Sequence, residues 1–130
     1  MSASQASALD VISLQLAATL DTYDHDVAKM VDTWLDMELY RTVSDEIEEI
    51  RRYSAALPQL GVPWVELLIA HGELVHSLWR LRFQEVESDR ERLAEVRDRH
   101  TACVRSLKMR CVHMLARAGL QDSPGPGAFA

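Results

Sequence analysis

Proline and glycine are scarce in this chain, and their positions divide it into two halves. The 130 residues include four prolines and five glycines. Before Ala118 they cluster once, in the segment Leu57 to Pro63, and Gly72 is the one other. On either side, residues 4–56 and 63–118 are rich in Ala, Leu, Glu and Arg, with apolar side chains every three or four residues. We therefore predict an all-α fold, either a long antiparallel helical hairpin or an up-down helical bundle, with its central turn at Leu57 to Pro63.

Long hydrophobic runs are also absent. No stretch reaches the roughly 18 consecutive apolar residues of a transmembrane helix, and Met1 is not followed by the basic and then apolar residues of a signal peptide. The only two cysteines, Cys103 and Cys111, would lie about 12 Å apart on one helix, too far for a disulfide. We therefore expect no membrane partner, reduced thiols and a cytoplasmic location.

Positive charge is limited, because two lysines and twelve arginines oppose 20 acidic residues and leave a net charge of −6. This balance argues against a nucleic-acid partner, which would need many phosphate contacts. Acidic residues concentrate in segment 21–49 and basic residues in segment 97–117. Antiparallel packing would bring Asp21 and Asp24 near Arg97 and Arg99; alternatively, both charged faces are simply solvated. The preference for Arg over Lys suggests a GC-rich bacterial source.

Motifs that identify common enzyme classes are missing. The chain contains no glycine-rich phosphate loop, no serine nucleophile elbow and no His-Glu-x-x-His segment. Cys103 and Cys111 recur with apolar residues along one helical seam, where burial would raise the pKa of a thiol and make it a poor nucleophile. We expect neither catalysis nor a cofactor, although an enzyme without a recognisable motif stays open.

The pattern leaves open whether the helices break at two further positions. The apolar stripe that runs from Leu9 to Met37 changes face afterwards, which favours a break near Arg41 to Ser44. Ser88 followed by Glu91 resembles a capping box that could separate two helices. Gly119 resembles a helix stop. We predict one helical domain over residues 1–119 and a flexible C-terminal tail over residues 120–130.

The helix expected after Pro63 is apolar around more than half of its circumference. Such a helix is typically buried on two sides, either within a bundle or in an oligomer interface. Gly72 would permit a close approach of another helix. Coiled-coil-like spacing is expected instead along the later helix that carries Cys103 and Cys111. We predict a homodimer, and the residues expected in the dimer interface or in a binding surface are Trp64, Val65, Leu68, Ile69, Gly72, Trp79 and Phe83.

Polar residues on the same helix provide two candidate sites. His71 falls within the apolar arc, so it is predicted to be a buried polar group that hydrogen-bonds across the core. Glu73 and His76 form a Glu-x-x-His element, the spacing that ferritin-like carboxylate sites use to bind metal. In an antiparallel hairpin, Glu46 or Glu49 would supply further carboxylates. On a helical wheel, however, Glu73 and His76 lie on the polar strip rather than facing inward.

Small acidic helical adaptors and chaperones share this architecture, although no family motif can be matched residue by residue. We predict a small cytoplasmic helical protein that acts through protein–protein interaction, as an adaptor, a chaperone-like protein or a regulator. The alternative is a metal- or ligand-binding helical bundle, a sensor or a ferritin-like protein, that uses the Glu-x-x-His element.

Overall fold

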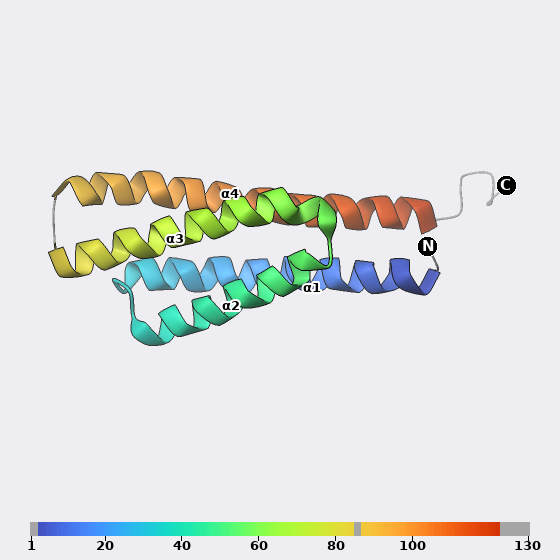
Figure 1. Ribbon diagram of the computed structural model, residues 1–130, viewed down its shortest axis with the longest axis horizontal. Coiled ribbons are helices and arrows are strands. Elements are labelled where there is room, and N and C mark those ends of the chain that lie inside the picture. The colour runs from blue at the N-terminus through green and yellow to red at the C-terminus, as the bar shows by residue number, and fades with distance from the viewer. Residues whose placement is uncertain (1–2, 85–86, 123–130) are drawn as a thin grey trace.

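The computed structural model describes residues 3–84 and 87–122, and the side chains of residues 8–84 and 88–117. Four α-helices run alternately in opposite directions: α1 (Ala3–Asp32), α2 (Met37–Ala55), α3 (Gly61–Gln84) and α4 (Glu87–Asp122) (Figure 1). A short 3₁₀ helix, η1 (Pro58–Leu60), joins α2 to α3. No strand occurs in these ranges. The all-α prediction is confirmed, and the expected turn at Leu57 to Pro63 contains η1 and the start of α3.

The break between α1 and α2 lies earlier than the sequence pattern suggested. A break near Arg41 to Ser44 is wrong, because both residues lie inside α2 and the turn comprises residues 33–36. Leu35 N–H donates to Met30 O at 2.9 Å and Trp34 N–H donates to Val31 O at 3.2 Å. These two bonds form a Schellman motif, which usually places glycine where Trp34 stands.

Strain in this turn is offset by burial and by capping. Trp34 and Leu35 have positive φ angles of 54° and 69°, a conformation that costs bulky residues about 1–3 kcal/mol. Leu35 is nevertheless fully buried in the core. The Asp36 carboxylate then caps α2 by accepting hydrogen bonds from the N–H groups of Glu38 and Leu39, both at 3.0 Å. Local contacts therefore fix a turn that contains no glycine.

The helices also separate near Ser88, the second position at which the sequence left a helix break open. Helix α3 ends at Gln84 and α4 begins at Glu87, so Ser88 lies in the first turn of α4 and the expected capping position falls slightly too late. Helix α4 continues to Asp122, past the stop predicted at Gly119. Of the tail predicted for residues 120–130, residues 123–130 lie outside the part that the structure describes.

All four helices contribute buried side chains to the core. Helix α3 packs extensively on α4, and α1 packs on both α2 and α4, whereas α2 and α3 contact each other sparsely. The side chains of one α3 face point inward with heptad-like spacing. They are the buried residues Pro63, Leu67, Ala70, Leu74, Ser77, Leu78 and Leu81.

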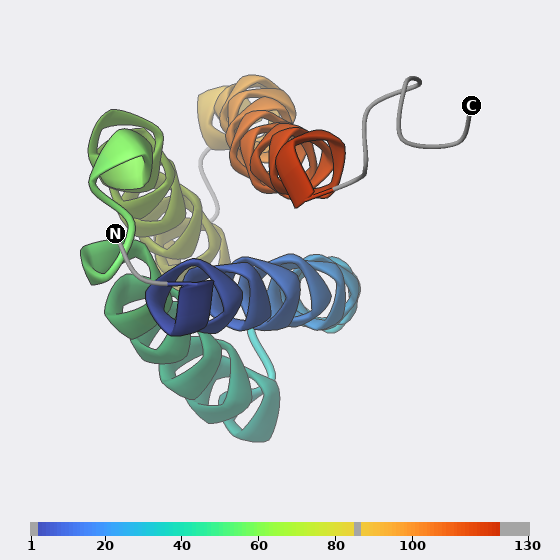
Figure 2. The same ribbon diagram turned by 90° about the vertical axis from the view of Figure 1, so that its right-hand side faces the viewer.

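Helix α2 diverges from α3 beyond their shared turn. The end-on view shows α2 slanting away from the other helices toward its N-terminal end (Figure 2). Arg82 bridges this end, because its guanidinium Nη1 donates to the carbonyl oxygen of Leu35 at 2.6 Å. A space is left between α2 and α3, and the residues that the structure describes leave one side of α3 uncovered. Within the described residues, no helix is both long enough and apolar enough to span a bilayer.

The charged residues of α1 and α4 pair differently from the prediction. Asp21 pairs with Lys108, not with Arg97 or Arg99. The Arg99 guanidinium instead lies 2.9 Å from the Glu73 carboxylate on α3. All four of these side chains are substantially exposed or at the rim, so each pair contributes only about 0–1 kcal/mol. The buried apolar residues, rather than these pairs, therefore fix how the helices align.

Candidate functional site

The side of α3 opposite the core carries a continuous row of exposed residues. Trp79 is 51% exposed, Ile69 57% and Phe83 59%, although side chains of this kind are normally buried. The row has alternating spacings of three and four residues, the pattern of a coiled-coil seam. We call it the outer face of α3, and it consists of Val62, Val65, Ile69, Gly72, His76, Trp79 and Phe83.

Most of the residues expected in an interface lie on this outer face or beside it. Leu68 is 43% exposed and adjoins the outer face. Trp64 differs, because its side chain is partly buried and packs against the core cluster. Helix α3 therefore has two apolar sides, as its sequence indicated, and the described residues cover only one of them. At Gly72 an added Cβ would meet no atom within 4 Å, so nothing within the chain requires glycine there.

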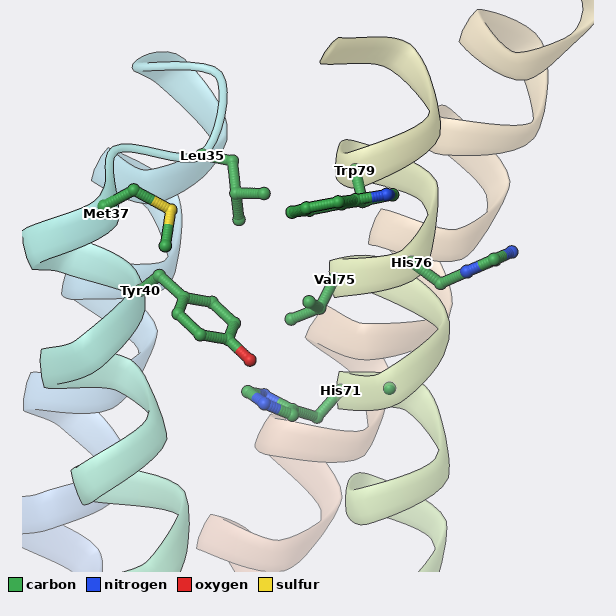
Figure 3. Close-up of a pocket in the computed structure, with 8 residues that line it drawn as sticks. Leu35, Met37, Tyr40, His71, Val75, His76 and Trp79 are labelled. Carbon is green, nitrogen blue, oxygen red and sulfur yellow. The ribbon is translucent and has the colours of Figure 1, made fainter. Parts of the chain in front are cut away.

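A cavity of about 410 Å³ lies where α2 and α3 separate. Figure 3 shows Met37 and Tyr40 on one wall, facing Val75 and Trp79 on the other, while His76 points away. The His71 ring extends from α3 into the space between the walls, toward the Tyr40 hydroxyl group. The described residues that line the cavity are Leu35, Met37, Tyr40, His71, Gly72, Val75, His76 and Trp79.

Beneath this cavity, a tyrosine hydroxyl links two histidines from different helices. Tyr23 Oη on α1 lies 2.7 Å from His71 Nδ1 on α3 and 2.7 Å from His100 Nε2 on α4. Tyr23 is fully buried, His100 is 1% exposed and His71 is partly buried. The sequence singled out His71, but it gave no indication that Tyr23 joins His71 to His100. We call these three residues the His-Tyr-His network.

The His-Tyr-His network is uncharged at neutral pH. Burial lowers the pKa of His71 to about 4, and burial also lowers the pKa of His100 to about 4, with smaller contributions from His71 and Arg97. Burial raises the pKa of Tyr23 well above its ordinary value. A single hydroxyl therefore donates its proton to one imidazole nitrogen and accepts an N–H from the other.

A second buried polar cluster joins α1 to α2. Burial first, and then a hydrogen bond to the Asp26 carboxylate and the charge of that group, together raise the pKa of Glu46 to about 8. Glu46 is only 9% exposed, and its Oε1 has no hydrogen-bond partner among the described residues. The Glu46 carboxyl group is therefore largely protonated at neutral pH.

Glu46→Gln should make the protein more stable at high pH. Since the folded-state pKa of Glu46 lies above the unfolded value of 4.5, the wild-type protein should lose stability as the pH rises from about 4.5 to about 8. Glutamine cannot ionise, so the variant should be more stable than the wild type at pH 8.5. We expect a difference of about 1–2 kcal/mol, because water near Glu46 screens the charge and reduces its effect on stability. At pH 4.5 the two should be equal.

Urea denaturation at one protein concentration, at pH 4.5 and pH 8.5, measures this difference. Glu48→Gln is the matched control, because Glu48 lies on the exposed side of α2 and pairs with Arg51. An equal response to pH in the wild type and in Glu46→Gln would show that Glu46 does not retain its proton.

The candidate metal ligands do not assemble. The Glu73 carboxylate accepts a hydrogen bond from Arg99 at 2.9 Å, and Glu49 accepts one from the Tyr53 hydroxyl at 3.0 Å. Glu46 faces Asp26, and His76 points away from the cavity (Figure 3). Among residues 3–84 and 87–122, no group of three or more His, Cys, Asp or Glu side chains is arranged to bind a metal ion.

The two cysteines are free thiols in an apolar setting. Burial raises the pKa of Cys111 to about 11, and burial followed by the Glu66 carboxylate raises that of Cys103. Both thiols are therefore protonated at neutral pH, which makes them weak nucleophiles.

Comparisons with protein-family models, with curated proteins and with solved structures found no match to this chain.

Proposed function

We propose that this protein acts through protein–protein interaction, and that the outer face of α3 binds a second copy of the chain. The observation that supports the proposal most strongly is the exposed heptad-spaced row on α3. Exposed Trp, Phe and Ile side chains in one contiguous row are unusual on a monomer, and aromatic residues are enriched at the centres of interfaces. The dimer would be the unit that acts as an adaptor or a regulator.

The order of large and small side chains favours a second copy in an antiparallel orientation. If two α3 helices cross about a twofold axis near residue 74, the seam residues meet in three kinds of layer. Gly72 of one copy faces His76 of the other, Val65 faces Phe83 and Ile69 faces Trp79. Each layer combines a smaller side chain with a larger one, so the two helices can approach closely without overpacking.

Charge along the edge of the outer face is compatible with the same register. Glu66 and Arg80 flank the seam on the same side and lie an equal number of residues from Glu73. Antiparallel pairing therefore places Glu66 of each copy near Arg80 of the other. Glu73 would approach its own counterpart, but its charge is already compensated by Arg99.

Trp79→Asp should abolish self-association. A buried carboxylate at the middle of the interface would be desolvated without a partner, so the dissociation constant should rise at least about 100-fold. Size-exclusion chromatography with light scattering should give the mass of a dimer for the wild type and that of a monomer for the variant. Val65→Asp, which alters a seam residue outside the cavity lining, should act in the same way.

Met109→Asp is the matched control, because Met109 is 48% exposed on α4 and lies off the outer face of α3. This variant should remain dimeric, with an unchanged helical circular dichroism spectrum. A wild-type protein that is monomeric at all concentrations, or a Trp79→Asp variant that remains dimeric, would contradict the proposal. A stable complex with a helix of another protein and no self-association would equally contradict it.

A further inference from the structure

The cavity between α2 and α3 has the composition of a site for a small organic molecule. Its volume of about 410 Å³ falls within the range of ligand pockets. None of the eight described residues that line it is Asp, Glu, Lys or Arg. The apolar groups of Leu35, Met37, Val75 and Trp79 form its upper walls, and the ring of Tyr40 completes one side (Figure 3). Such walls favour an uncharged ligand, because a charge would be desolvated without a partner.

One polar atom that faces the cavity has no hydrogen-bond partner among the described residues and is open to a ligand or to water. His71 Nδ1 is occupied by Tyr23 Oη at 2.7 Å. Among the described residues, none forms a hydrogen bond with the other ring nitrogen, Nε2, and the ring extends into the cavity (Figure 3). The bond to Tyr23 holds the imidazole in one orientation, so Nε2 is presented at a fixed position. A ligand with one polar group directed at Nε2 would satisfy this nitrogen.

The His-Tyr-His network allows Nε2 to bind either a donor or an acceptor. When Tyr23 donates to His100, it accepts the Nδ1–H of His71, and Nε2 then carries a lone pair. When Tyr23 instead accepts from His100 and donates to His71 Nδ1, the proton of His71 is on Nε2. The two states differ only in which neutral tautomer each histidine adopts. Either a hydroxyl or a carbonyl group on the ligand could therefore pair with His71.

We propose that this cavity binds a neutral aromatic molecule with a single hydroxyl or carbonyl group, whose ring lies between Tyr40 and Trp79 and whose polar group bonds with His71 Nε2. The aromatic rings of Tyr40 and Trp79 supply surfaces on which a planar ring can pack. The site is formed within one chain and does not rest on self-association.

A pair of probes that differ in one hydroxyl group tests both parts of the proposal. Binding of 2-naphthol and of naphthalene is followed by NMR shift changes of backbone amides. The wild type should bind both, 2-naphthol at least tenfold more tightly, with the largest shifts at residues 37–40 and 71–79. Failure of both probes to bind, or shifts located elsewhere, would overturn the cavity assignment, and equal affinities would overturn the role of His71.

His71→Asn isolates the Nε2 atom. The asparagine amide can occupy the position of Nδ1 and keep the hydrogen bond with Tyr23, while nothing replaces Nε2. The advantage of 2-naphthol over naphthalene should fall below about threefold in this variant, with naphthalene affinity unchanged. A preserved tenfold advantage would show that the hydroxyl group does not bond with His71.

Val75→Trp fills the cavity without removing any hydrogen-bonding group. It should reduce the affinity for both probes at least tenfold, whereas the control Val112→Trp, at an exposed position of α4, should leave both affinities unchanged. Unaltered binding to Val75→Trp would overturn the assignment. In the monomeric Val65→Asp variant both probes should bind as to the wild type, so loss of the dimer and loss of the site give different results.

Discussion

Tyr23→Phe should lower the free energy of unfolding by about 3 kcal/mol. Among the described residues, this hydroxyl group is the one hydrogen-bond partner of His71 Nδ1 and of His100 Nε2, each at 2.7 Å. Removing it leaves two buried imidazole nitrogens without a hydrogen bond, and each unsatisfied buried group costs about 1–3 kcal/mol. The phenyl ring fills the same space, so a packing defect does not contribute. Urea denaturation at pH 7 measures the change.

Two comparisons separate this effect from a general loss of a tyrosine. Tyr53→Phe removes a hydroxyl that donates to the Glu49 carboxylate near the surface, and it should cost less than about 1 kcal/mol. Adding His100→Leu to Tyr23→Phe removes one of the unsatisfied groups and should restore part of the lost stability. If Tyr23→Phe is as mild as Tyr53→Phe, the His-Tyr-His network does not contribute to stability as described.

Gly72→Leu should have opposite effects on the monomer and on the dimer. Glycine in a helix interior costs roughly 0.5–1 kcal/mol relative to alanine, and a Cβ added at this position meets no atom of the described residues within 4 Å. The stability of the monomer should therefore increase by about 0.5–1 kcal/mol. In the dimer, a leucine would push apart the helices where Gly72 faces His76 of the second copy, so the dissociation constant should rise at least tenfold.

Each effect has its own measurement. Monomer stability is measured by introducing Gly72→Leu into the monomeric Val65→Asp variant, and self-association is measured by light scattering over a dilution series. Ala102→Leu places the same side chain at an exposed position of α4, and self-association should not change. A Gly72→Leu variant that is more stable and also dimerises as tightly as the wild type would show that the helices do not meet at Gly72.

Periodicity predicted the helices and most of the core, because apolar spacing records which side of a helix is buried. It did not predict where α1 ends. Trp34 and Leu35 adopt positive φ angles of 54° and 69°, a conformation that sequence reasoning assigns to glycine or asparagine. The signals that could have located this turn are Asp36 as a helix cap and Glu38 in the following first turn. Both were present, but the continuous apolar stripe through Met37 outweighed them.

The candidate sites were predicted less completely than the fold. Because His71 falls within the apolar arc of its helix, the sequence indicated that it could form a hydrogen bond across the core. No local pattern, however, identifies a partner 48 residues away. The proximity of Asp26 to Glu46 likewise depends on how α1 and α2 align. The Glu73 and His76 spacing suggested a metal site, but spacing along a helix does not determine what the neighbouring helix supplies. Helix α4 supplies an arginine.

The central claim, that two copies pair through the outer face of α3 in an antiparallel orientation, is tested most directly by one distance. A spin label is attached at Val62→Cys, in a chain whose Cys103 and Cys111 are replaced by alanine. Val62 lies twelve residues from the proposed axis, so at 1.5 Å per residue the two labels of a dimer should be roughly 36 Å apart. Pulsed electron paramagnetic resonance should show this separation. A separation near the 8–10 Å between packed helix axes would indicate parallel pairing, and no intermolecular distance would indicate that α3 does not pair; either result would contradict the account.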